Sequence, residues 1–473
     1  MGSLSAALSG AASALDALQY ALNVSQNNIA NASTPGYARQ TASLEADPFD
    51  PSVGLFGGVA QGPIADSRDL LAERAVWQQA GAQGAATAQN EALADIQNSL
   101  PVSSGGIPAA LNSFFSAVSA WSASPTDGST QQAVMDAASS LTHSFNTTAA
   151  GVANVSQNIT QSISDTVSQI NDLTSQLASL NEAVQGGAQH DAGVSAQIYN
   201  TLETLSGLVN IEVLPQQDGT VQVTLAGGQP LVVGTQQYQL RAGSAAPPAN
   251  PIDPQAPPDA AIFGPDGNDV TNQITSGTLY GQLQVRNSVI PALTGDQTQP
   301  GALNQLATSL ANTVNSIVSQ GFVSNGAQAA TGLFAAPDPA HPDSAALNLA
   351  VDPNMSAAGL PAIQNTGGVT VPNGVPLALN ALASTPQIDN VTYTAFYGNA
   401  AASVGRQLNQ AQSNQTLATQ SLAQAQSMRQ TAEGVDLNAE AVKVIQFQQG
   451  YQAAAKLVST LNSLNQALLD MMP

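Results

Sequence analysis

The stretch LSAALSGAASALDALQYALNVSQNNIANASTPGYARQ, residues 4–40, predicts a long amphipathic helix that ends in a sharp turn. Apolar or small residues recur in alternate steps of four and three, which is the spacing of a coiled-coil seam. The seam positions are Leu4, Leu8, Ala11, Leu15, Leu18, Leu22, Ser25 and Ile29. Such a helix needs a partner, because most helix stability in proteins comes from packing of the apolar face.

The other end of the chain carries a matching seam in a second expected helix. Its positions are Val444, Phe447, Tyr451, Ala454, Val458, Leu461, Asn465, Leu468 and Met472. We expect Leu457, Leu464 and Met471 to widen this stripe. Neither helix has a partner close to it in the sequence, so each terminal helix is expected to pack against the other.

Asparagines lie beside the seam near the end of the first helix. Asn23, Asn27 and Asn31 are spaced by four residues and therefore share one face of the helix. Asn28 and Asn31 have the alternative role of ending the helix, since Asn tolerates the left-handed cap conformation. For Asn23 and Asn27, inside the helix, an interface role and a purely structural role remain equally open.

The sequence TPGY, residues 34–37, places proline and glycine at the two central positions of a type II turn. Such a turn would direct the chain away from the helix axis. Tyr37 and Arg39 would then contact a neighbouring molecule or the domain that follows.

The composition narrows the class of protein. Only 8% of the 473 residues are charged, and nine Lys and Arg stand against thirty-one Asp and Glu. This balance argues against binding to nucleic acid or to an anionic membrane surface. The absence of cysteine excludes disulfides and thiolate chemistry. No run of eighteen apolar residues predicts a membrane span, and the start lacks the pattern of a Sec signal.

Between the terminal helices the chain alternates helical and β-type segments. Helices are expected from 66 to 100, around 111–121, from 129 to Gly186-Gly187, over 301–321 and over 391–432. A pair of hairpins is expected within 209–242, where alternating Val, Ile and Leu are split by Asp-Gly and Gly-Gly. The segment GTLYGQLQVRNSV, residues 277–289, is expected to be a strand that runs into a helix.

The expected fold class is mainly α with a small β part. It comprises paired N- and C-terminal coiled-coil helices, an elongated helical-bundle domain and a small β-hairpin-rich portion. The expected boundaries are 1–50 and 433–473 for the terminal coiled-coil domain, 51–205 for the bundle with its returning helix at 391–432, 206–300 for the β-hairpin-rich portion, 301–325 for a helix and 326–390 for a loop-rich insert.

Catalytic and cofactor-binding patterns are missing from the sequence. It has no phosphate-binding loop, no dinucleotide-binding glycine pattern, no nucleophile elbow and no H-E-x-x-H motif. His143, His190 and His341 lie in unrelated segments and do not have the spacing of metal ligands. We therefore expect no enzyme activity, cofactor or metal site.

Both ends of the chain carry signatures of a known family. SQNNIANASTPGYARQ, residues 25–40, resembles the N-terminal signature of rod, hook and hook-associated proteins of the bacterial flagellum. GVDLNAEAVKVIQFQQGYQAAAKLVSTLNSLNQALLDMM, residues 434–472, resembles their C-terminal signature. Segments 205–234, 276–287 and 303–322 are similar to segments of a hook-associated member that joins hook and filament.

The resemblance implies a structural subunit at the junction between hook and filament, exported by the flagellar type III route to the cell exterior. The implied partners are identical subunits in a ring, the hook protein, the second junction protein and an export chaperone at the C-terminal helix, with no nucleic acid and no membrane. Another axial role, in rod or hook, and a secreted surface protein with flagellar-type ends are the alternatives. The expected assembly interface comprises Leu4, Leu8, Leu15, Leu18, Leu22, Asn23, Asn27, Ile29, Tyr37, Arg39, Val444, Phe447, Tyr451, Val458, Leu461 and Leu468.

Overall fold

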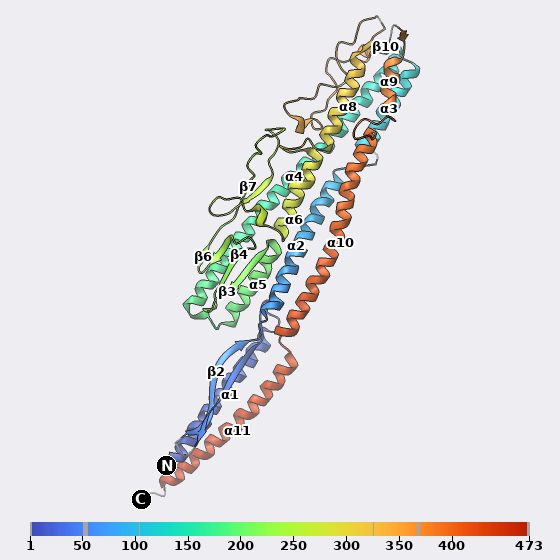
Figure 1. Ribbon diagram of the computed structural model, residues 1–473. Coiled ribbons are helices and arrows are strands. Elements are labelled where there is room, and N and C mark those ends of the chain that lie inside the picture. Colours follow the sequence, from blue (N-terminus) through green and yellow to red (C-terminus); the bar gives the residue numbers. More distant parts are fainter. Residues whose placement is uncertain (1, 51–54, 104, 325, 367–368, 471–473) are drawn as a thin grey trace. The chain divides into compact units, whose positions relative to one another are not determined.

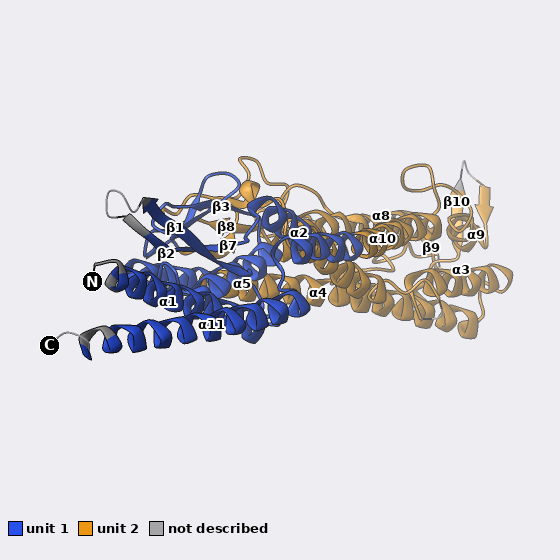
Figure 2. Cartoon of the chain, turned by 90° about the horizontal axis from the view of Figure 1, so that it is seen from below, with its two compact units in different colours: residues 1–81, 172–238, 418–473 blue, residues 82–171, 239–417 orange. Residues whose placement is uncertain are grey.

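The two terminal helices, α1 (Gly2–Asn31) and α11 (Leu437–Asp470), pack along each other in the computed structural model of the protein (Figure 1), which confirms the predicted pairing. The structure describes residues 2–50, 55–103, 105–324, 326–366 and 369–470. It is mainly helical with small antiparallel sheets, as the sequence predicts. Its residues form two compact units, coloured in Figure 2. Unit 1 comprises Met1–Gly81, Asp172–Tyr238 and Ala418–Pro473, and unit 2 comprises Ala82–Asn171 and Gln239–Leu417.

A β-hairpin that the sequence analysis did not predict follows the turn after α1. Strands β1 (Gln40–Asp50) and β2 (Leu55–Asp66) pair antiparallel from Gln40 opposite Asp66 and lie along α1 (Figure 1). The hairpin contains few β-branched residues and little alternation of apolar and polar residues, so its sequence lacks the usual strand pattern. Packing against α1 therefore stabilises a hairpin that the pattern of its own side chains does not predict.

Unit 1 contains a four-stranded antiparallel sheet in the order β3-β4-β5-β6, which confirms the predicted pair of hairpins. The strands are β3 (Ile211–Pro215), β4 (Val221–Leu225), β5 (Pro230–Val233) and β6 (Gln236–Gln237). Helix α5 (Ala192–Leu208) precedes the sheet. Three long helices contribute residues to both units: α2 (Leu70–Asn98), α4 (Gly128–Ala183) and α10 (Tyr393–Glu433). Helix α4 ends in a π-helical turn, Val184–Ala188, where Gly187 adopts a φ of 114°.

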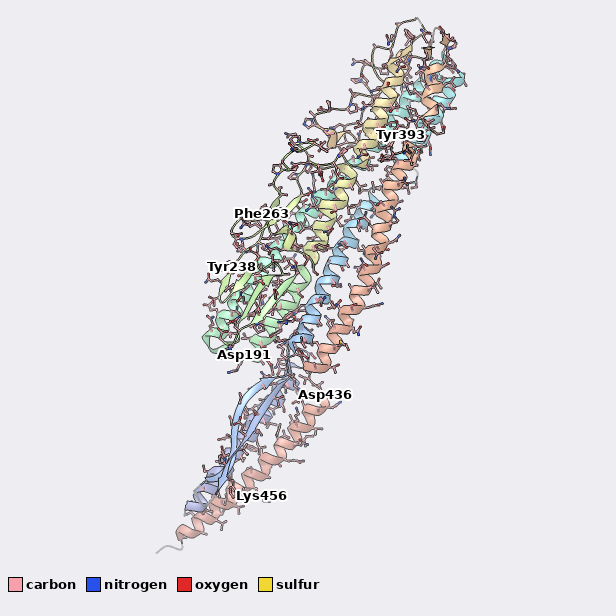
Figure 3. All side chains as sticks on the ribbon, in the orientation of Figure 1. Asp191, Tyr238, Phe263, Tyr393, Asp436 and Lys456 are labelled. Atoms are coloured by element: carbon pink, nitrogen blue, oxygen red, sulfur yellow. The ribbon has the colours of Figure 1, made fainter. Side chains whose placement is uncertain are left out.

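Two helices of unit 1 begin at aspartates that are labelled in Figure 3. Asp191 Oδ1 accepts hydrogen bonds from the backbone N–H groups of Gly193 and Val194 at the start of α5. Asp436 Oδ1 accepts in the same way from Asn438 and Ala439 at the start of α11. Each carboxylate satisfies N–H groups that have no partner within the helix, so these side chains set where α5 and α11 start.

Unit 2 is helical with two small sheets. Its helices include α3 (Ile107–Ala123), α6 (Thr278–Gln284), α7 (Ile290–Thr294), α8 (Ala302–Ser319) and α9 (Gly374–Ala381). One sheet pairs β7 (Arg241–Ser244) with β8 (Ala260–Phe263), and the other has the order β11 (Val369–Val371), β10 (Ile363–Thr366), β9 (Gly321–Phe322). Its largest fully buried side chains include Phe114, Trp121, Phe145, Phe334, Tyr393 and Tyr397.

The strand predicted at the start of residues 277–289 is wrong, because the segment is helical from Thr278 through a π-helical turn, Val285–Val289. Leu279, Gly281 and Leu283 are buried, and this spacing of two mimics a strand. A Cβ added at Gly281 would lie 2.4 Å from the carbonyl oxygen of Ala85, so the glycine permits close approach to α2. The helical conformation of this segment depends on close packing against α2, which the local sequence pattern does not show.

Five asparagines of the described chain dock strands and loops onto helices by one repeated arrangement, which we name the asparagine clamp. In each, Nδ2 donates to the carbonyl oxygen of one residue, and Oδ1 accepts from the N–H of that same residue. The pairs are Asn28 with Gln40, Asn171 with Leu240, Asn181 with Val221, Asn287 with Ala260 and Asn315 with Phe334, at distances of 2.8–2.9 Å. An amide side chain satisfies both backbone groups without burying a charge.

Candidate assembly interface

The predicted seam residues of α1 form part of its contact with α11. Leu4, Leu8, Leu15, Leu18 and Leu22 are half-buried. The most buried residues of α1 are smaller and comprise Ala11, Ala17, Ala21, Val24, Ser25 and Asn28. A Cβ added at Gly450 of α11 would lie 3.2 Å from Leu18 Cδ2, which shows how closely the helices approach. The seam is therefore used within one chain and remains partly open to solvent.

On α11 the predicted seam lies on the half-buried face. Val444, Phe447, Val458 and Leu461 are half-buried, and Tyr451 is 37% exposed. The side chain of Leu468 lies outside what the structure describes.

A second apolar face of α11 is exposed. We name it the outer stripe and define it by Val442, Ile445, Leu457 and Leu464, whose exposed fractions lie between 51% and 53%. Successive helix residues are rotated by about 100°, which places these four side chains within roughly a third of the circumference. Val442 and Ile445 lie opposite the seam, and Leu457 and Leu464 lie along its edge. Leu457 and Leu464, which the sequence predicts to widen the seam, are 53% and 51% exposed, so the contact between α1 and α11 does not bury them.

The turn after α1 has the predicted type II geometry. Gly36 adopts a φ of 75°, and the N–H of Tyr37 donates to the carbonyl oxygen of Thr34 over 3.2 Å. A Cβ added at Gly36 would lie 2.2 Å from the carbonyl oxygen of Ala196 in α5. Glycine is thus required here both by the backbone conformation and by the close approach of α5.

Tyr37 folds back onto its own helix rather than toward another molecule. Its hydroxyl donates toward the Oδ1 atoms of Asn27 and Asn28, at 3.0 and 2.9 Å. Burial, together with the charge of Glu440, raises the pKa of Tyr37 to about 12, so the hydroxyl remains a donor at physiological pH.

The backbone of Arg39 is hydrogen-bonded within the chain. Its backbone N–H donates to the carbonyl oxygen of Glu433 over 2.9 Å, and its own carbonyl oxygen accepts from the N–H of Ser67. The predicted contact with the part of the chain that follows is therefore observed for the backbone of Arg39, whereas the hydrogen bonds of the Tyr37 hydroxyl go back to α1.

The asparagines of α1 divide into two groups. Asn23 and Asn27 are exposed, and Asn27 also accepts from the side chain of Asn31. Asn31 donates to the carbonyl oxygen of Asn27 at the end of the helix. Asn28, for which the sequence suggested only an end-of-helix role, is buried and clamps Gln40 at the start of β1. Its distinguishing signal is its position three residues after Ser25 of the seam, on the buried side of the helix.

Replacing Asn28 with alanine is expected to free the start of β1. The backbone N–H and carbonyl oxygen of Gln40 lose their partner, which costs about 1–3 kcal/mol for each group left unsatisfied. Hydrogen exchange of the peptide around Gln40 measures the loss. The matched variant Asn23→Ala changes an exposed asparagine of the same helix and should leave this exchange unchanged. Equal exchange in both variants would contradict the clamp.

A buried cluster of charges lies next to the turn in unit 1. Glu73 is fully buried and forms ion pairs with Arg68 and with Arg429, the latter at 3.0 Å. Arg429 also pairs with Glu203 at 2.7 Å. The guanidinium carbon of Arg68 lies 3.6 Å from the ring centroid of Tyr199. This arrangement positions α2, α5 and α10 and offers no group poised for catalysis.

The described residues contain no group of three or more His, Asp or Glu side chains arranged to hold a metal ion. In the same part of the chain, no helix combines the length and the hydropathy that crossing a membrane requires.

Comparison with known proteins assigns the family. The model of the flagellar hook-associated protein FlgK helical domain matches residues 93–334, which is more than half of the chain. Residues 429–471 match the C-terminal model of flagellar basal body rod FlgEFG proteins, and residues 8–37 match the flagella basal body rod protein model.

Individual relatives agree with these matches. The chain is 29% identical to flagellar hook-associated protein 1 of Escherichia coli over 334 residues, which cover 68% of this chain and 59% of that protein. It is 24% identical to flagellar hook-associated protein 1 of Bacillus subtilis over 504 residues, covering 95% of each. The chain thus matches less than two thirds of the length of its Escherichia coli relative.

A solved structure shows the same fold. The flagellar hook junction protein FlgK from Burkholderia pseudomallei superposes with a TM-score of 0.64 at 16% identity, covering 75% of this chain and 99% of that one. Together with the helical-domain match, which spans more than half of the sequence, these findings show that the chain belongs to the family of the flagellar hook-associated protein FlgK.

Proposed function

We propose that the chain is a structural, non-enzymatic subunit of the bacterial flagellum that joins hook to filament at the cell exterior. Family membership supports a role as an axial component that assembles with other flagellar components. The rod-family models match only the two ends of the chain, whereas the Bacillus subtilis hook-associated protein matches along 95% of it. This difference favours a junction role over the rod and hook roles that the sequence left open.

The observation that carries the proposal is the two-sided character of α11. One face packs on α1, and the outer stripe beside and opposite that face remains exposed at 51–53%. Large apolar side chains such as these four gain about 1.5–3 kcal/mol each when they are fully buried. We infer that copies of this chain and neighbouring flagellar subunits cover this stripe in the assembled flagellum.

The seam residues and the exposed amides of α1 complete the proposed interface. Ile29 and Asn23 are exposed and face solvent in the single chain. The predicted assembly role of the other seam residues stays a prediction, and that of Leu468 concerns a side chain outside the described part of the structure.

The proposed partners are identical subunits in a ring, the hook protein, the second junction protein and an export chaperone at the C-terminal helix. Export is proposed to follow the flagellar type III route. The low charge content supports subunit packing, because buried charges without partners are costly.

Deleting the gene tests the junction role. The expected result is cells with hooks but without filaments, and flagellin lost to the medium. Normal filaments on the deletion strain would overturn the proposal.

The same strain tests the outer stripe when it is complemented with variants. The double variant Ile445→Gln with Leu457→Gln is expected to weaken each subunit contact more than tenfold and to leave few filaments, while the circular dichroism of the purified chain is unchanged. Ser459→Gln, on an exposed flank of α11 outside the stripe, is the matched control. The amount of chain in the medium separates a defect in assembly from one in export. Full filament formation by the double variant would show that the stripe is not an interface.

A further inference from the structure

Five side chains of unit 1 form a connected charge network: Arg68, Glu73, Glu203, Arg429 and Glu433. They come from four parts of the chain, namely the connector between β2 and α2, α2 itself, α5 and α10. Arg68 Nη2 also donates to the carbonyl oxygen of Gly36 over 2.8 Å, so the network reaches the turn after α1.

Glu433 is the point where the network meets the terminal segments. Its Oε1 accepts from the backbone N–H of Asp69 over 2.9 Å. Its carbonyl oxygen accepts from the N–H of Arg39 over 2.9 Å and from the hydroxyl of Ser67 over 3.2 Å. Glu433 is the last residue of α10, and α11 begins at Leu437. One residue thus connects the segment after α1, the connector before α2 and the start of the C-terminal helix.

The charges of the network do not balance, since two guanidinium groups, of Arg68 and Arg429, face three carboxylates. Glu73 and Glu203 make direct hydrogen bonds to these cations. The closest cation to Glu433 is Arg68, whose Nη1 lies 3.6 Å from Oε2, beyond hydrogen-bond distance. Glu433 is therefore a buried carboxylate with the weakest compensation in the network.

We propose that the charge network is a proton-sensitive latch, which holds residues 36–39 and 67–69 against the end of α10 while Glu433 is protonated and weakens when Glu433 ionises. The proposal concerns the isolated chain and does not depend on the flagellar role.

Glu433 is a carboxyl group of the network that burial brings into titration near neutral pH. Burial raises the pKa of Glu433 to about 7, and the negative charge of Glu73 adds to this effect. Burial also raises the pKa of Tyr199, to about 12, so its hydroxyl stays neutral. The guanidinium groups stay cationic over this range. Asp66 and His190 line a cavity of about 80 Å³ beside Arg68. Because histidine side chains commonly change charge near neutral pH, the experiment includes a variant of His190 as a control.

Proton linkage determines whether the latch becomes weaker or stronger as the pH rises. The latched state releases the Glu433 proton at a pH of about 7, whereas an open, solvated carboxyl releases it near its ordinary value of 4.5. Between these values the latched state binds more protons, so its stability decreases as the pH rises. From pH 6 to pH 8 the latching equilibrium is expected to weaken about tenfold.

Hydrogen exchange of the full chain at pH 6 and pH 8 tests the latch, after correction for intrinsic exchange rates. The peptides that contain the N–H groups of Arg39 and Asp69 should lose about tenfold protection at pH 8 in the wild type. In Glu433→Gln, which keeps an oxygen to accept from Asp69 but cannot ionise, the protection should be the same at both pH values. Glu182→Gln, an exposed residue of α4, and His190→Gln should retain the wild-type response.

The latch is overturned if the wild-type protection is the same at both pH values, or if Glu433→Gln loses as much protection as the wild type. A wild-type response that disappears in His190→Gln would assign the titration to the histidine and also reject the proposal. If Glu433→Gln does not fold, carbon NMR of the wild-type Glu433 carboxyl decides the question. A midpoint near 7 supports the latch, and one near 4.5 rejects it.

Discussion

Asn181→Leu is expected to lower the free energy of unfolding of unit 1 by about 3–5 kcal/mol. Asn181 is fully buried on α4, and Nδ2 donates to the carbonyl oxygens of Val221 and Gly234 over 2.8 and 2.6 Å. Its Oδ1 accepts from the N–H of Val221 over 2.9 Å. Leucine fills a similar volume but leaves three backbone groups of the sheet without a partner.

Urea unfolding combined with hydrogen exchange measures this effect. Exchange should increase most in the peptides of β4 and of the β5–β6 turn. Asn23→Leu, at an exposed position on α1 in the same unit, should change the unfolding free energy by less than about 0.5 kcal/mol. A loss below about 1 kcal/mol in Asn181→Leu would show that the clamp does not anchor the sheet.

Glu73→Gln is expected to destabilise unit 1 by about 3–5 kcal/mol, because it removes one partner of a buried ion-pair network. Glu73 is fully buried and holds Arg68 through Oε1 and Arg429 through Oε2. Glutamine keeps the shape of the side chain but directs an amide NH2 group at one of the two guanidinium groups. The buried cation of Arg68 and the partly exposed cation of Arg429 are then left with fewer carboxylates.

Thermal unfolding at pH 8, followed by circular dichroism, compares Glu73→Gln with Glu91→Gln at an exposed position of the same helix. The control should unfold like the wild type. Glu433→Gln at the same pH should protect the latch, although it removes a carboxylate from the same network. Equal destabilisation by Glu73→Gln and Glu433→Gln would show that the network has no surplus negative charge.

The helix seams and the turn at Pro35-Gly36 were predicted correctly from the sequence. The seams of residues 4–29 and 444–465 predict two helices that need each other, and α1 packs along α11. The Pro35-Gly36 pair predicts a type II turn, and the observed φ of Gly36 agrees. These features depend on helix periodicity or on the conformations that one residue type allows, so they are visible in a local segment.

Features whose local sequence pattern is weak or misleading, and which depend on packing against another segment, were not visible. The hairpin of residues 40–66 has a weak strand pattern and packs on α1, and the helix that begins at Thr278 resembles a strand because alternate residues are buried against α2. The outer stripe could be recognised only from the way α11 lies on α1. Leu457 and Leu464 are only one or three residues away from seam positions in the sequence, so their exposure could not be predicted from spacing.

The sequence by itself determined the helical class, the pairing of the two ends, the turn at Pro35-Gly36 and the resemblance to flagellar axial proteins. Only the tertiary structure decided which asparagines are clamps, and it brought Glu433 together with Arg39, Ser67 and Asp69. The physical reason is that hydrogen bonding and desolvation depend on the groups that surround a side chain. For Glu433 those groups are more than 350 residues away in sequence.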